Sequence, residues 1–467
     1  MFNSVNNYQG IDWALYLKSV RKDVSLMTEA LCDFYTSHFR IHYPVSFYRT
    51  LLQPELATLH YKWYKRKSWS SDSSESRAKL DSYRQIRITD QNRSQKQLMD
   101  EAICAEKYDC WDLGFFHRHP IFQKSLQNTE VCILTLRNFK NRPKEILNRR
   151  LRESVRQHLQ ESGLCKFANF VSEQLASHFL EFFLPFVQMV EKAVFPKVIL
   201  ASAHGIYHPV SLYLLARARL SDVPIVAMQP GLPHSQMFYH DQVCYEAYLS
   251  TIYLKWGQPN GIVPDHKARE FGCFYRESTN DSFKNDGVLV ILPQIPCFPK
   301  ANSSYWNGHD TDSFLARTRK TIERLSTIEN VVFRCKSCDQ DIYSNWTSRL
   351  ISADINAGDR FGTFRRCVVL YNSTAIIEAF AQGQQTLIHF GPEQTLLTNQ
   401  ADRDYRKLVS DGILVDDLDL LCERIVRSEV NCSYSAQTAF DFLEKYAHPI
   451  SPSESAERLE HIVNREF

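Results

Sequence analysis

Two series of short apolar segments that alternate with helical segments constrain the fold of this chain most strongly. The first series begins near residue 195 and the second near residue 288. Such alternation is typical of parallel sheets, because a helix must carry the chain back before the next parallel strand can form. A polar stretch at 273–286, without apolar periodicity, separates the two series. The sequence therefore predicts two α/β domains that join near residue 275.

The predicted elements are short, and the segment before residue 195 reads mainly as helix, with one strand at 131–136. In the first series, strands at 197–201 and 224–228 flank a helix at 209–220. In the second series, we expect strands at 288–292, 331–334, 367–370, 386–390 and 413–415, and helices at 311–327, 374–382, 401–410 and 417–428.

The predicted fold class is α/β, with two Rossmann-like domains that face a cleft behind a helical N-terminal extension. We expect residues 1–275 to form an N-terminal domain that is helical at its front and Rossmann-like from about 195. Residues 276–467 would form the C-terminal domain with a terminal helix. A length of 467 residues suits two such domains. Ligands of open parallel sheets bind at the carboxyl ends of the strands.

Composition narrows the function classes. The formal net charge of +2 gives no indication of nucleic-acid binding. The 13 cysteines are scattered and odd in number, which favours a reducing compartment over a disulfide framework. No signal peptide is visible, and the longest apolar window, 179–200, contains Glu181, Glu191 and Lys192. We therefore expect a cytoplasmic protein without a membrane span.

A basic run from 137 to 156 has eight Lys or Arg residues against two Glu. A solvated helix face is the ordinary explanation. Contact with anionic lipid or an acidic acceptor is the alternative. Peripheral contact with a membrane is therefore an open possibility.

The segment 368–383 combines a buried strand, a polar turn and a helix that ends near Gly383. Asn372, Ser373 and Thr374 fall where the helix begins, so free N–H groups, hydroxyls and the positive end of a helix dipole meet at the end of a strand. Such a place suits a phosphate. Glu378 lies one turn deeper, where its carboxylate can accept hydrogen bonds from a ribose. An ordinary capped helix explains the same pattern without a ligand.

Polar residues also follow two strands of the first series. His204 and Gly205 come after the strand at 197–201, and a glycine there allows close approach of a ligand. His204 can act as a base or donate to an anion, or it can be an ordinary core histidine. A second group at the next strand end consists of Gln229, Gly231 and His234, for which a tight structural turn is the alternative. We expect a shared site at these strand ends.

Two further side chains are candidates for the chemistry. Glu246 lies among aromatic residues that can raise its pKa, which suits an acid or base, although an exposed helix position is the alternative. Arg334 ends a strand and can pair with phosphate, or else form a surface ion pair. The phosphate-loop, dinucleotide, zinc-protease and serine-hydrolase motifs are missing. No clear pair of aspartates for a metal is present, so we expect neither a metal nor a bound cofactor.

The order of several motifs resembles a family of bacterial surface-carbohydrate transferases with a GT-B-like fold, similar in layout to transferases of Kdo and other ulosonic acids. The resemblance covers most of the chain and is most specific at 229–257 and 366–415. The matching pieces are Pro44 to Leu52, Gln229-Pro230-Gly231, Glu246, Leu254 to Gly257, Tyr371 to Thr374, Glu378-Ala379, Thr386 to Ile388 and Gly412 to Leu414. One departure is clear: the family has Gln-His-Gly-Gly where this chain has Pro230 after Gln229.

The resemblance implies a metal-independent glycosyltransferase of lipopolysaccharide or capsule synthesis. It would move a sugar, with Kdo or another ulosonic acid as a candidate, from a nucleotide donor such as a CMP-linked sugar to a glycan or lipid-linked acceptor, in the cytoplasm or at the inner membrane. Arg334, Asn372, Ser373, Thr374 and Glu378 would bind the donor. His204 and Glu246 would be catalytic, with Gly205, Gln229, Gly231 and His234 on the acceptor side. The alternatives are a sugar-nucleotide epimerase, a polymer transferase, or an inactive scaffold, since Pro230 replaces the family histidine.

Overall fold

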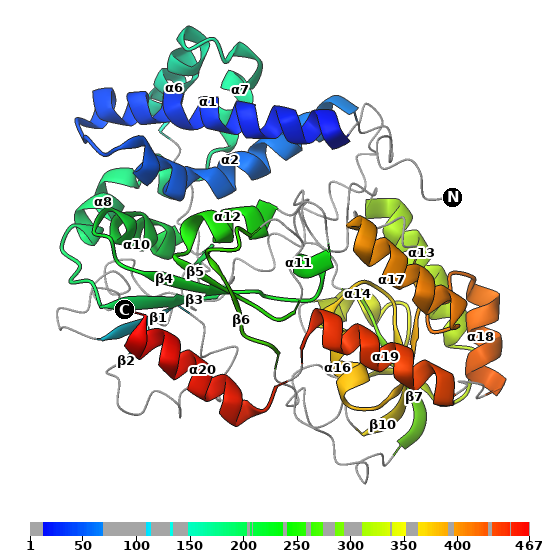
Figure 1. Cartoon of the computed structure of the whole chain (residues 1–467). Helices are drawn as coiled ribbons and strands as arrows, with labels where there is room; N and C mark the ends of the chain where they lie inside the picture. The colour runs from blue at the N-terminus through cyan, green and yellow to red at the C-terminus, as the bar shows by residue number, and fades with distance from the viewer. Residues whose placement is uncertain are drawn as a thin grey trace.

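Two parallel β-sheets form the centres of two α/β domains in the computed structural model of this chain (Figure 1). The predicted architecture, an α/β protein of GT-B-like layout with a helical N-terminal extension, is confirmed by these two sheets and the helices around them. The structure describes residues 13–68, 109–113, 131–133, 148–202, 206–207, 209–236, 241–257, 263–273, 285–293, 311–336, 339–351, 363–390, 397–427, 432–448 and 450–466.

Six strands make up the N-terminal sheet within these ranges, in the order β2-β1-β3-β4-β5-β6. All neighbouring strands are parallel. Their bounds are Cys110–Leu113 for β1, Val131–Ile133 for β2, Val198–Ala201 for β3, Ile225–Met228 for β4, Ile252–Lys255 for β5 and Ala268–Glu270 for β6. The runs in β1, β3 and β4 are buried throughout, because helices cover both faces of the sheet.

Alternate side chains of this sheet point to different layers. Ile199, Ile225 and Tyr253 join the core beneath α10 (Pro209–Leu220) and α12 (Asp241–Leu249). Leu200 and Val226 point to the other face, where the last helix, α20 (Pro452–Arg465), packs with Leu459, Ile462 and Val463. Figure 1 shows α20 on the side of the sheet opposite α10 and α12. The terminal helix, which was predicted to belong to the C-terminal domain, therefore completes the N-terminal one.

The helical front of the chain stacks on the α10–α12 layer. It contains α1 (Trp13–Phe39), α2 (Val45–Ser68), α6 (Arg149–Glu161) and α7 (Cys165–Gln174), with η4 (Ser177–Phe179) and α8 (Phe183–Val190) leading into β3. Arg152 of the predicted basic run is buried here. Its guanidinium binds both carboxylate oxygens of Glu181 and three backbone carbonyls, so all five of its N–H donors are used. This part of the run is therefore structural.

The C-terminal sheet has five described strands, all parallel, in the order β11-β10-β7-β8-β9. The strands are β7 (Asn285–Ile291), β8 (Val331–Arg334), β9 (Leu350–Ile351), β10 (Phe364–Val369) and β11 (Gln385–Ile388). Helices α16 (Thr374–Ala381), α17 (Asn399–Ser410) and α19 (Cys432–Tyr446) share a core on one face. Helices α13 (Thr311–Leu325) and α18 (Leu418–Arg427) pack on the other, with the short α14 (Gln340–Tyr343) beside them.

The two domains touch where the segments after β5 and after β6 meet the end of α19. The N–H of Cys273 donates to the carbonyl of Ala447 at 2.8 Å. A Cβ atom at Gly257 would lie 2.4 Å from the carbonyl oxygen of Lys445, so only a glycine allows the two backbones to approach this closely. None of the described helices is long and apolar enough to cross a membrane.

Candidate functional site at the domain junction

The turn between β10 and α16 begins a helix at the carboxyl end of a strand, as the sequence predicts. The buried strand β10 ends at Val369, and Ser373 is the N-cap of α16, with its hydroxyl accepting from the N–H of Ala375 at 3.0 Å. A serine in extended conformation favours this start because its oxygen satisfies an orphan helix N–H. Asn372 precedes it and is 2% exposed. The positive end of the helix dipole is therefore flanked by one carboxamide and two hydroxyls, those of Ser373 and Thr374.

The loop after β4 of the N-terminal domain reaches this turn. The N–H of Leu232 lies 3.4 Å from the hydroxyl oxygen of Thr374. The Leu232 side chain is fully buried and belongs to the C-terminal core, together with Ile376 of α16. The short helix α11 (Pro233–Gln236) follows and lies between the two domains in Figure 1. The structure thus brings the predicted acceptor-side loop and the predicted phosphate turn together.

A buried polar cluster lies behind this contact and consists of Gln236, Tyr405 and Asn372. The Tyr405 hydroxyl is 3.0 Å from Gln236 Oε1 and 2.9 Å from Asn372 Oδ1. Burial raises the pKa of Tyr405, so its hydroxyl remains a proton donor. The carbonyl of Gln236 also accepts from the N–H of Thr398, the N-cap of α17, at 2.8 Å. Residues of both domains therefore share one hydrogen-bonded group.

The side chain of Gln229 stabilises the turn that follows β4 by two hydrogen bonds. Its Oε1 accepts from the N–H of Trp256 at 3.1 Å, and its Nε2 donates to the carbonyl of Gly231 at 3.1 Å. The side chain is 3% exposed. Gln229 therefore ties the end of β5 to the loop that carries Leu232, while Gly231 supplies a carbonyl within the same turn.

Arg334 and Glu378 lie within electrostatic reach of each other. Arg334 ends β8, paired in register with Ile291 of β7, and Glu378 lies one turn inside α16. Burial raises the pKa of the Glu378 carboxyl, and the positive charge of Arg334 offsets part of that rise. Arg334 is thus close enough to Glu378 to favour the ionised form of its carboxyl.

The candidate catalytic residues occupy different surroundings. Glu246 lies on α12 and is fully buried in the N-terminal domain. Its charge raises the pKa of the neighbouring Tyr253, after the larger effect of burial. His234 belongs to α11, and its side chain lies outside the described residues, as do His204 and Gly205. The catalytic role of each of these residues stays a prediction.

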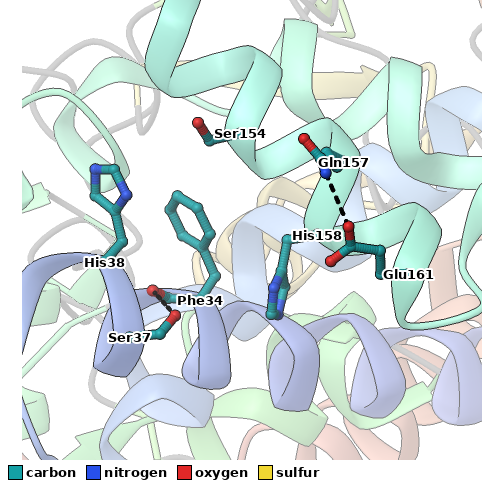
Figure 2. Close-up of a pocket in the computed structure, with 7 residues that line it drawn as sticks. All are labelled: Phe34, Ser37, His38, Ser154, Gln157, His158 and Glu161. Atoms are coloured by element: carbon teal, nitrogen blue, oxygen red, sulfur yellow. Dashed lines mark hydrogen bonds between the residues drawn. The ribbon is translucent and has the colours of Figure 1, made fainter.

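A shallow pocket of about 270 Å³ lies far from this junction, between α1 and α6. Figure 2 shows Phe34 between the imidazoles of His38 and His158, with ring centroids 5.0 and 5.7 Å away. Around this ring are Ser37, Ser154, Gln157 and Glu161. No predicted site residue lines the pocket.

Gln236, Tyr405 and Leu232 were not predicted from the sequence as part of the site. Tyr405 is one of the apolar-spaced positions of α17 with Ala401 and Leu408, so its pattern indicates only a core residue. Gln236 is 169 positions away from it in the chain. A contact at that distance leaves no local pattern in a single sequence.

The fold and this junction define a two-domain α/β protein in which a helix N-terminus rich in hydrogen-bond donors faces the neighbouring domain. The chain belongs to the LIC12162 family of transferases, whose family model matches residues 21–426. The prediction of a transferase is thereby confirmed.

Comparisons with other proteins do not identify a substrate for this chain. No curated protein has a matching sequence. Among solved structures, TarM is 12% identical with a TM-score of 0.36, and the match covers 60% of this chain but only 57% of TarM. Anabaena HepE, in complex with UDP and glucose, is 8% identical with a TM-score of 0.41, over 77% of this chain and 100% of HepE. The glycosyltransferase SnogD from Streptomyces nogalater is 13% identical with a TM-score of 0.39, over 76% and 99%.

Proposed function

We propose that this transferase is a glycosyltransferase of GT-B type that moves a sugar from a nucleotide-activated donor to a glycan acceptor. One observation carries the proposal: the N-terminus of α16, with Asn372, Ser373 and Thr374, meets the N-terminal domain at Leu232. A phosphate at this turn would lie beside the facing domain, where an acceptor would have to bind. The motif order at 229–257 and 366–415 supports the same class.

The proposed catalysis is electrostatic. Negative charge grows on the leaving phosphate as the bond to the sugar breaks. The dipole of α16 and the hydroxyls of Ser373 and Thr374 would stabilise that charge, and the Arg334 guanidinium would add a full positive charge. The Glu378 carboxylate would accept hydrogen bonds from the ribose. The charge on the leaving phosphate would thus be stabilised by side chains and backbone groups of the protein itself.

The finer assignment rests on the sequence resemblance. We propose a CMP-linked ulosonic acid such as Kdo as the first donor to test, and a bacterial surface polysaccharide or its lipid-linked precursor as the acceptor. Of the two candidate bases, Glu246 is enclosed in the N-terminal core beside Tyr253. His204 is therefore the first residue to replace when the acceptor-side base is sought.

The direct experiment is calorimetric binding of CMP-, UDP-, GDP- and dTDP-linked sugars to the purified full chain. We expect one nucleotide class to bind and its affinity to fall when Thr374→Ala is combined with Glu378→Ala. A folded wild type that binds none of these ligands would refute the proposal.

Product analysis then separates the remaining classes. A transferase releases the nucleotide only in the presence of an acceptor, whereas an epimerase changes the sugar without one. Full function in vivo of the Thr374→Ala/Glu378→Ala variant would instead indicate an inactive scaffold.

A further inference from the structure

The polar cluster of Gln236, Tyr405 and Asn372 has more hydrogen-bonding capacity than it uses. Gln236 is 0% exposed and Asn372 is 2% exposed. Within the described part of the chain, the side-chain amino groups Gln236 Nε2 and Asn372 Nδ2 have no hydrogen-bond partner. A buried donor without a partner destabilises the fold, so native proteins rarely keep one unless something else satisfies it.

Tyr405 alone cannot satisfy both carboxamides. A phenol has one O–H and two lone pairs. It donates to one carboxamide oxygen, and it can accept from the amino group of the other carboxamide if that group is turned over. The two amino groups together carry four N–H donors, and the phenol oxygen can accept from at most two of them. In every orientation at least two buried N–H groups therefore remain without an acceptor. The cluster is therefore complete only when an additional acceptor is present.

The position of the cluster indicates what kind of acceptor this is. Asn372 directly precedes Ser373, the N-cap of α16, and Gln236 is linked to the same turn through the Tyr405 hydroxyl. The backbone carbonyl of Gln236 accepts from the N–H of Thr398 at the start of α17. Amino groups, hydroxyls and a helix N-terminus all favour oxygen atoms with negative charge. A phosphate or diphosphate group matches this set of donors.

We propose that Tyr405 is a positioning residue that orients Asn372 and Gln236, so that their side-chain amino groups donate to the phosphate oxygens of the donor substrate. This inference deepens the proposed function and rests on it. Gln236 comes from the N-terminal domain, whereas Asn372 and Tyr405 come from the C-terminal one. Phosphate binding would then also strengthen the junction between the domains.

The key variant is Tyr405→Phe, which removes the hydroxyl and keeps the ring that packs against Phe390 and Phe442. The matched control is Tyr213→Phe. Tyr213 is equally buried, and its hydroxyl donates to the carbonyl of His178 at 2.7 Å within the N-terminal domain. A third variant, Gln236→Glu, keeps an oxygen for Tyr405 but replaces the amino group by a second oxygen.

The probes are inorganic pyrophosphate and the panel of nucleotide sugars, measured by calorimetry alongside thermal unfolding of each variant. We expect Tyr405→Phe and Gln236→Glu each to weaken binding by about tenfold or more, the size of a lost hydrogen bond to a charged group. Tyr213→Phe should change affinity less than about twofold, even if its melting temperature falls equally. In steady-state assays, KM for the donor should rise more than kcat falls.

Affinity in Tyr405→Phe equal to that of the wild type would overturn the inference and leave the proposed function intact. Equal weakening in Tyr213→Phe would also overturn it, since the effect would then be one of general stability. If pyrophosphate binds and depends on Tyr405 while no nucleotide sugar binds, the proposed function fails, and the cluster remains a phosphate site without a nucleotide-sugar donor. If neither probe binds the wild type, both fail.

Discussion

Gly257 of the N-terminal domain abuts the main chain of Lys445 at the end of α19, where a Cβ atom would come within 2.4 Å of the carbonyl oxygen. We expect Gly257→Ala to push α19 away and to lower the free energy of unfolding by about 1–3 kcal/mol, as overpacking does. Urea unfolding would measure the loss. Gly163→Ala is the control, because Gly163 has φ +77° but no atom within 4 Å of an added Cβ. Gly163→Ala should lower the free energy of unfolding only by the roughly 1–2 kcal/mol that a left-handed backbone costs a residue with a Cβ. Hydrogen exchange at Cys273, which reports on the domain junction, should stay unchanged in this control.

We expect a large loss of stability when the buried ion pair of Arg152 and Glu181 is broken. Arg152→Met leaves the Glu181 carboxylate buried without its partner, and breaking such a pair costs about 3–5 kcal/mol. Arg156→Met, on the same helix, removes an exposed partner of Glu153 and should lower stability far less. Urea unfolding of both variants is the measurement. Equal losses would mean that the buried contacts of Arg152 do not stabilise the fold as described.

Glu378 predicts a pH dependence with a defined sign. Burial raises its pKa above the usual value of 4.5, with a partial offset from Arg334. Between 4.5 and the raised pKa, the folded protein binds more protons than the unfolded chain. Its free energy of unfolding therefore contains a contribution that falls as pH rises through this window. Glu378→Gln should remove that contribution, as seen in the difference between the two unfolding curves from pH 4.5 upward.

Ligand affinity should follow the opposite trend. If a ribose hydroxyl donates to the Glu378 carboxylate, nucleotide binding strengthens as this group loses its proton over the same window. The Glu378→Gln variant should bind with an affinity that is flat across it. If nucleotide affinity depends on pH in the same way in the wild type and in Glu378→Gln, Glu378 does not bind the ribose.

Two serine N-caps allow stability and binding to be separated. Ser373 accepts from the N–H of Ala375 at 3.0 Å, and Ser451 accepts from the N–H of Glu454 at 3.1 Å. Replacing either by alanine should cost about 1 kcal/mol of stability. Only Ser373→Ala should also weaken nucleotide binding in calorimetry. Unchanged binding in this variant would mean that the Ser373 hydroxyl does not contact the ligand.

Much of the sheet architecture could be predicted because buried parallel strands have a strong local pattern. The strand at 331–334 and the helix at 209–220 are β8 and α10 as predicted. The short β5, Ile252–Lys255, was not predicted as a strand, since four residues before a polar turn give little periodicity. The segment at 413–415 joins the sheet only by a bridge between Ile388 and Leu414.

The turn at Asn372, Ser373 and Thr374 could be predicted because it depends on local capping chemistry. Its partner could not. The contact between Leu232 and Thr374 joins positions 142 residues apart, and nothing in either segment specifies the other. The burial of Arg152 could not be predicted either. Its neighbours Arg149 and Arg150 are exposed, and nothing in the basic run distinguishes the one arginine that the fold buries.

The return of α20 to the N-terminal sheet has a consequence for biosynthesis. The C-terminal sheet lies between two segments of the chain that both belong to the other domain, so it is inserted into that domain. Leu459, Ile462 and Val463 cover one face of strands that begin at Cys110. During synthesis, the first of those strands, β1, leaves the ribosome more than 300 residues before the helix that covers it. The domain that is made first is therefore completed last, and in the meantime its uncovered apolar face is a candidate site for chaperone binding.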